Sequence, residues 1–169
     1  DFDDALLWSF ANAFDDGASH LNLYNTADLL RKDLLLAVGN ADEFFPTVAA
    51  VLLFGKNERV AELLPRSNLT VARFSGEGSA AQLIEAAEIK GNMLSQFEAV
   101  TAFLGRYIDL NKQQPKRKLM LVGDDIAKPR GRYHHYAVVE AVINALIHRD
   151  LGLRDIRTRI NIYDNAVEF

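Results

Sequence analysis

The chain has 169 residues, of which 49% are hydrophobic and 25% charged, and its formal net charge is −4. A chain of this length can bury roughly 70% of the surface that its unfolded form exposes, which is enough for one good core or two modest ones. It contains no cysteine, which excludes disulfides and thiolate metal sites and favours a reducing, cytoplasmic setting. Since no apolar run approaches the length of a membrane span, we expect no membrane partner.

Helical and strand-like patterns alternate along the sequence, and Thr26, Pro46, Gly55 and Gly91 mark breaks between them. Thr26 is the expected N-cap of the second helix. The predicted elements, in chain order, are helices over residues 3–14 and 26–36, a short helix running into a strand over 47–54, a strand over 69–74, helices over 80–89 and 93–108, and a strand over 118–122.

The C-terminal region predicts a helix followed by a β-hairpin. The helix covers residues 136–150, and residues 157–163 then alternate with the period of a strand, with arginines on one face and isoleucines on the other. An Asp-Asn pair at 164–165 predicts a tight turn into residues 166–169. Strands that alternate with helices and end in a hairpin predict an α/β (α+β) fold with helices packed on a mixed sheet. Because the sequence ends inside a strand-like run, we expect a fold truncated at its C-terminus and a longer parent protein.

The most informative segment is the helix over residues 136–150, in which Glu140, Asn144 and His148 recur every four residues. Side chains with this spacing project from one side of a helix, and apolar residues occupy the other directions. The pattern predicts a largely buried helix whose carboxylate, amide and imidazole need partners such as a metal ion or a ligand. The alternative is a core helix whose polar edge reaches water.

Two short motifs match known sites only formally. Residues 76–81 fit a glycine-rich dinucleotide fingerprint, but Glu77 places a negative charge where phosphate would bind, which favours a plain strand-to-helix turn. The tripeptide His148-Arg149-Asp150 matches the start of a protein kinase catalytic loop, but Asp155 stands where that loop requires an Asn. Neither motif predicts a site by itself.

Metal and nucleic-acid binding are the remaining candidates. The spacing of His134, His135, Glu140 and His148 matches no zinc-binding helix motif. Concentrated positive charge would be needed to bind phosphate backbones. Two basic clusters supply it locally, although a solvated linker and a strand edge explain them equally well: Lys112, Lys116, Arg117 and Lys118, and Arg154, Arg157 and Arg159.

The run Glu140-Ala-Val-Ile-Asn144-Ala-Leu-Ile-His148-Arg-Asp150 resembles the N-box of a GHKL-type ATPase. It resembles most the form of the N-box found in bacterial and archaeal transcriptional regulators related to the ATP-dependent DNA helicase RecG. Four upstream segments agree in order and spacing, so that the resemblance covers about residues 26 to 169: Pro46 to Gly55, Arg73-Phe74-Ser-Gly76, Ile89-Lys-Gly91 and Tyr133.

The resemblance implies ATP and Mg²⁺ as cofactors of the full-length protein, with weak or absent binding by this chain. Glu140 would polarise the attacking water, Asn144 would ligate Mg²⁺, and His148 and Asp150 would contact phosphate or order the following loop. An Asn carbonyl is a hard oxygen ligand suited to Mg²⁺, and a carboxylate one turn away can reach a metal-adjacent water. The family also implies a DNA partner, bound through an N-terminal Schlafen AlbA-type domain.

In this interpretation residues 1–38 form an N-terminal helical segment, 39–115 an α/β domain, and 116–169 the N-box helix and hairpin of an incomplete GHKL-like domain. The sequence departs from the family at four places, which are His134, Val139, Leu151 and Asn165-Ala166. The competing interpretation is therefore a non-catalytic module with a degenerate nucleotide site, which forms a homodimer through its exposed hairpin edge. The sequence contains no Walker-type segment, so it does not indicate a helicase that separates DNA strands.

Overall fold

The computed structural model describes residues 2–14, 26–34, 36–39, 43–111, 133–152 and 157–169. The chain divides into two compact units. The first unit contains Asp1–Leu69, Glu88–Gln96 and Leu151–Arg157, and the second contains Thr70–Ala87, Phe97–Asp150 and Thr158–Phe169. Among the described helices, none has the length and apolar character that crossing a membrane requires.

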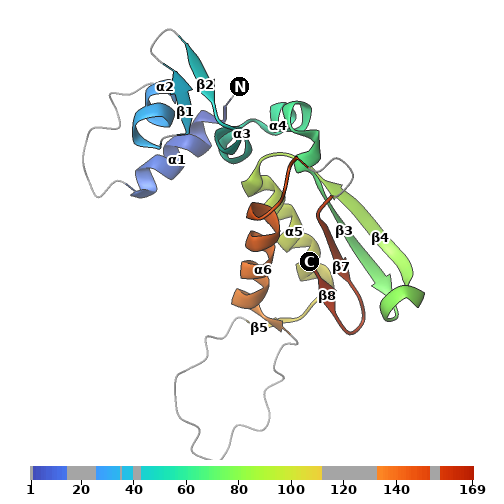
Figure 1. Cartoon of the computed structure of the whole chain (residues 1–169). Helices are drawn as coiled ribbons and strands as arrows, with labels where there is room; N and C mark the ends of the chain where they lie inside the picture. The colour runs from blue at the N-terminus through green and yellow to red at the C-terminus, as the bar shows by residue number, and fades with distance from the viewer. Residues whose placement is uncertain (1, 15–25, 35, 40–42, 112–132, 153–156) are drawn as a thin grey trace, which may run out of the picture. The chain divides into compact units, whose positions relative to one another are not determined.

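The first unit is mainly helical, with one small antiparallel hairpin (Figure 1). Its elements are α1 (Asp4–Phe14), α2 (Thr26–Asp28), the π-helical turn η2 (Leu29–Asp33), β1 (Ala37–Gly39), β2 (Phe44–Pro46), α3 (Val48–Phe54), α4 (Asn57–Leu63) and the 3₁₀ turn η3 (Pro65–Ser67). Its core consists of buried apolar side chains from α1, η2, β1 and α3, namely Leu7, Ala11, Leu29, Leu30, Ala37, Ala50 and Phe54.

Thr47 shows how the sequence starts a helix in this unit. Its side-chain oxygen accepts a hydrogen bond from the Ala50 N–H at 3.2 Å, which caps α3, and its hydroxyl donates to the Leu36 carbonyl at 2.9 Å. The predicted helix over 47–54 is confirmed, without the strand expected at its end. The predicted N-cap Thr26 is instead the first residue of α2, and its hydroxyl donates to Asp4 at 2.9 Å.

The second unit is built on a mixed sheet, which confirms the predicted α+β class. The strands are β3 (Leu69–Ser75), β4 (Gln82–Ile89), β7 (Arg159–Ile162) and β8 (Val167–Glu168), in the spatial order β4-β3-β7-β8. β3 and β7 are parallel, with Val71 opposite Ile160, whereas β7 and β8 form the predicted antiparallel hairpin. A separate pair of short parallel strands is formed by β5 (Leu110–Asn111) and β6 (Tyr133–His134).

Helices α5 (Met93–Tyr107) and α6 (His135–Ile147) lie on the same side of this sheet in Figure 1. Apolar side chains of both helices and of β3 and β7 are buried, as the alternation in residues 157–163 predicted for the isoleucines. The buried side chains of the second unit are Val71, Ala72, Val100, Phe103, Leu104, Val138, Val142, Leu146, Ile160 and Ile162.

The predicted helix over residues 80–89 is wrong, because this segment forms strand β4. Its Gln, Leu, Glu and Ala residues are good helix formers, but pairing with β3 overrides this local preference. The reversal between the strands depends on Gly76 and Gly78, whose φ angles of 97° and 59° favour glycine. The glycine-rich segment 76–81 therefore links two strands through the short 3₁₀ turn η4 (Gly78–Ala80), so the helix that a dinucleotide fingerprint needs is missing here.

Other predictions are confirmed in part. The helices over 3–14 and 93–108 and the strand over 69–74 are present, and the helix over 26–36 is shorter and changes to π-helical geometry. The helix over 136–150 ends at Ile147, one residue before its cap at His148. The strand predicted over 118–122 lies outside the described residues.

Candidate functional site

Glu140, Asn144 and His148 form a polar line on α6. This line faces away from the buried side of the helix. Val138, Val142 and Leu146 are the buried positions, whereas Glu140 and Asn144 are exposed. The expectation of a largely buried helix is wrong, because only one side of α6 is covered. The polar groups consequently need no compensating partner inside the protein, and they are accessible to a ligand.

Glu140 and Asn144 contact each other across one helical turn. The Asn144 Nδ2 donates to Glu140 Oε1 at 3.4 Å, a long hydrogen bond between two exposed side chains. Because this hydrogen bond uses Nδ2, the Asn144 Oδ1 takes no part in it. The structure therefore brings together two of the predicted site residues, with a carboxylate and an amide oxygen on one surface.

His148 and Asp150 lie where α6 ends. His148 is exposed and forms the C-cap, and its backbone N–H donates to the Asn144 carbonyl at 3.1 Å. Asp150 is exposed and follows the helix. His148 therefore continues the line of Glu140 and Asn144, whereas Asp150 does not belong to it.

Arg149 brings a cation to the same end of the helix. Its Nε donates to the Leu146 carbonyl at 2.8 Å, one of the carbonyls that an α-helix leaves unpaired at its C-terminus. Burial lowers the pKa of this guanidinium from its ordinary value. Arg149 thus stabilises the end of α6. The match of residues 148–150 to a kinase catalytic loop has no structural counterpart, because His148 caps a helix.

Large apolar side chains stand exposed beside the polar line. Tyr136 is 54% exposed, Ile143 37% and Ile147 53%. By helical spacing they form a row next to Glu140 and Asn144. The exposed side of α6 is consequently half polar and half apolar, which is the composition of a surface that contacts a ligand or another segment.

No group of three or more His, Asp or Glu side chains converges on a metal site within the part of the chain that the structure describes. The rings of His134 and His135 contact the Tyr136 ring in a tilted and an edge-on arrangement, with ring centroids 5.7 Å apart in each case. Zinc binding is therefore unsupported by the described residues. The pair of Glu140 and Asn144 offers only oxygen donors, which suits Mg²⁺ where phosphate and water complete the coordination.

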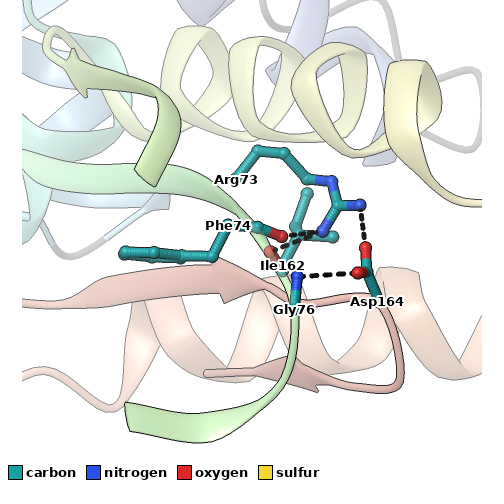
Figure 2. A network of polar contacts seen from close by, with 5 residues as sticks. All are labelled: Arg73, Phe74, Gly76, Ile162 and Asp164. Carbon is teal, nitrogen blue, oxygen red and sulfur yellow. Dashed lines mark hydrogen bonds and ion pairs between the residues drawn. The ribbon is translucent and has the colours of Figure 1, made fainter. Parts of the chain in front are cut away.

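A second polar cluster joins the two turns of the sheet (Figure 2). Asp164 accepts hydrogen bonds from the Arg73 guanidinium and, at 2.7 Å, from the Gly76 N–H. Its own backbone N–H donates to the Gly76 carbonyl at 3.2 Å. Arg73 also donates to the carbonyls of Phe74 and Ile162. We call Arg73, Gly76 and Asp164 the turn clamp.

The turn clamp was not predicted from the sequence, although each of its two segments contains a predicted turn. The sequence predicts only a turn at Asp164, and no spacing connects this residue to Arg73 and Gly76. Stacking of Phe74 on Tyr163, with centroids 5.1 Å apart, adds an aromatic contact between the same two turns. The clamp therefore fixes the geometry at one end of the sheet.

A charged aromatic cluster connects β4 to the end of α5. Glu85 accepts hydrogen bonds from the Tyr107 hydroxyl and from Arg106, the latter at 2.9 Å. The hydrogen bond from Tyr107, followed by that from Arg106, lowers the pKa of Glu85 below its ordinary value of 4.5. Arg106 also lies over the Phe103 ring at 4.6 Å. These groups neutralise one another, so the cluster holds two elements together.

In the first unit, the start of α5 is fixed by Asn92, which is only 4% exposed. Its Oδ1 accepts from the Ser95 N–H at 2.9 Å and its Nδ2 donates to the Gly55 carbonyl at 3.1 Å. Gly91 precedes it with a φ of 101° and leaves no room for a side chain against Asn57. An open hollow of about 550 Å³ lies beside these residues, lined by residues 2–4, 6, 56–58, 92, 94 and 95.

The basic residues considered for nucleic-acid binding are placed only in part. Arg157 forms an ion pair with Glu88 at 3.1 Å, and Arg159 is exposed on β7. Lys112, Lys116, Arg117, Lys118 and Arg154 lie outside the described residues. Because Arg157 is neutralised, the described part of the second cluster is not a concentrated positive patch.

Comparison with known proteins establishes the fold and no family. No protein-family model matches the chain, and no curated protein is significantly similar to it. The chain is similar to the crystal structure of the DIP2311 protein from Corynebacterium diphtheriae, with a TM-score of 0.53 and 21% sequence identity. The similarity covers 93% of this chain and 27% of that chain. At this level of identity the similarity supports the α+β fold alone.

Proposed function

We propose that the exposed side of α6 is the N-box of a GHKL-like, Mg²⁺-dependent ATP site in a longer, DNA-linked regulatory protein related to the RecG helicase family. The observation that carries the proposal is the contact between Glu140 and Asn144 on the open face of the helix. Both side chains lie opposite the buried residues of α6, so that a nucleotide can approach them without unfolding the core.

The chemistry of the donor pair supports a metal-bound phosphate. An amide oxygen and a carboxylate are hard ligands, and Mg²⁺ in nucleotide sites is usually held by one or two such groups together with phosphate oxygens and water. When bound, Mg²⁺ would neutralise part of the phosphate charge. Asn144 would hold the metal, and Glu140 would orient a water beside it.

The other predicted residues have subordinate roles in this proposal. His148, at the C-cap of α6, and Asp150, which follows the helix, would contact phosphate or order the loop. The exposed apolar row of Tyr136, Ile143 and Ile147 supports the proposal, because another part of the nucleotide domain or the ligand would cover it.

A non-catalytic interaction module is the second candidate. The observation that favours it is the hairpin edge, since β8 is the last strand in the described sheet and Phe169 is 47% exposed. Unpaired strand edges invite pairing with another copy. In that case α6 would be a scaffold and no nucleotide would bind.

Titration with a non-hydrolysable ATP analogue, with and without Mg²⁺, distinguishes the two functions. We expect Mg²⁺-dependent binding by the full-length protein and weak or absent binding by these 169 residues. Asn144→Ala should weaken the Mg²⁺-dependent affinity at least about tenfold, the scale on which metal sites respond to loss of a supporting ligand. The matched control is Asn165→Ala, which removes an exposed amide from the turn before β8. Equal, Mg²⁺-insensitive affinities of the wild type and Asn144→Ala would refute the metal role.

A further inference from the structure

We propose that the free edge of β4 pairs in an antiparallel manner with β4 of a second copy of this chain. β4 is the terminal strand of the described sheet, on the side opposite β8. It extends over eight residues, Gln82–Ile89, and contains neither proline nor lysine. Proline, lysine and a short strand are among the features that protect a sheet edge, and β4 has none of these three. Its charged side chains are Glu85 and Glu88.

Two neighbouring apolar side chains are exposed on this strand. Leu83 is 58% exposed and Ile84 57%. Because successive side chains of a strand point to opposite faces, the start of β4 exposes apolar surface on both faces of the sheet. The other edge differs, because β8 has only the two residues Val167–Glu168. A partner strand would therefore gain more backbone pairing and more apolar contact at β4.

The charges on β4 are compatible with self-pairing. Glu85 is paired with Arg106 at 2.9 Å, within the second unit. Glu88 is paired with Lys90 at 2.9 Å and with Arg157 at 3.1 Å, within the first unit. Both carboxylates are thus neutralised by their own chain, which removes the repulsion expected when two acidic strands approach each other.

An antiparallel register with its twofold axis at Ala86 uses the whole strand. It places Leu83 opposite Ile89 of the second copy and Ile84 opposite Glu88 of the second copy, with no two carboxylates directly opposite. Both copies contribute the same surface, as a closed twofold dimer requires. The partner is therefore a second copy, with each β4 completing the edge of the other.

Cysteine cross-linking tests this geometry, because the chain has no cysteine of its own. Residues directly opposite in antiparallel strands have Cα atoms about 4.5 to 5.5 Å apart, within the range that a disulfide spans. Under mild oxidation Ala86→Cys should give a covalent dimer. Glu168→Cys, which places a thiol on the opposite edge, is the matched control and should remain monomeric. Equal yields of covalent dimer from the two variants, or none from Ala86→Cys, would overturn the proposal.

Sedimentation over a concentration series of the full chain provides a test without cross-linking. We expect a monomer–dimer equilibrium that Ile84→Lys weakens about tenfold, since each substitution acts twice in a twofold interface. Phe169→Lys on the other edge should leave the equilibrium unchanged, and circular dichroism checks that both variants are folded. A wild-type chain that remains monomeric, or a dimer lost only in Phe169→Lys, would contradict pairing through β4. Neither outcome depends on nucleotide binding at α6.

Discussion

Removal of the Asp164 carboxylate should loosen the two turns that the turn clamp joins. Asp164→Ala deletes the acceptor of the Gly76 N–H, at 2.7 Å, and the partner of the Arg73 guanidinium. The Arg73 side chain is 16% exposed and that of Asp164 46%, so the ion pair is only partly screened by solvent. A hydrogen bond to a charged group contributes about 1.5 to 3 kcal/mol when buried, and an exposed ion pair about 0 to 1 kcal/mol. Because Asp164 is partly exposed, we expect Asp164→Ala to lower the free energy of unfolding by about 1 to 2 kcal/mol.

Urea unfolding followed by circular dichroism measures this loss. For a small protein the expected change lowers the unfolding midpoint by about 0.5 to 1 M. Hydrogen exchange of the Gly76 amide, measured by NMR, should accelerate in the same variant, because its acceptor is removed. Glu98→Ala, an exposed carboxylate of α5, is the matched control. A shift for Asp164→Ala no larger than that of the control, with unchanged Gly76 exchange, would refute the role of the clamp.

Three further outcomes follow from the described contacts. Asn92→Ala should lower the free energy of unfolding by about 2 to 3 kcal/mol in urea titrations, because it removes the α5 cap and leaves the Gly55 carbonyl unpaired. The Tyr107 hydroxyl, followed by Arg106, lowers the pKa of Glu85, so the stabilisation by its carboxylate is complete above pH 4.5 and is lost as the pH falls through the lowered value. Glu85→Gln should therefore flatten the decrease in Tm below pH 4.5, and an unchanged slope would contradict this. Glu140→Gln should change the free energy of unfolding, measured by urea titration, by less than about 0.5 kcal/mol, because this side chain is exposed.

The sequence predicted those elements in which local pattern and tertiary structure agree. Alternation of arginine and isoleucine in residues 157–163 corresponds to β7, in which Ile160 and Ile162 are buried. The helical pattern over residues 93–108 corresponds in the same way to α5. In both cases one physical signal, the periodicity of the side chains, was sufficient.

Residues 80–89 show where local pattern fails. Their composition favours a helix, and only the reversal after Gly76 together with pairing to β3 makes them a strand. The environment of α6 was missed for a related reason. Periodicity indicated that apolar residues surround the helix, but which of its sides is covered depends on the neighbouring elements.

The turn clamp joins residues that lie far apart in the sequence. Arg73 and Asp164 are separated by 91 positions, and no local spacing connects them. They meet because β3 and β7 are parallel neighbours, which places Arg73 opposite Ile162. The contact between Glu140 and Asn144 could be predicted from the sequence, because side chains four residues apart on a helix are neighbours.

The most direct test of the proposed function is calorimetric titration of the full-length protein with a non-hydrolysable ATP analogue, in wild-type, Asn144→Ala and Asn165→Ala forms. If α6 presents an N-box, binding requires Mg²⁺, is weakened at least about tenfold by Asn144→Ala and is unaffected by Asn165→Ala. Binding that is absent in the folded wild type, or that ignores both Mg²⁺ and Asn144, would show that this face of α6 holds no metal-bound nucleotide.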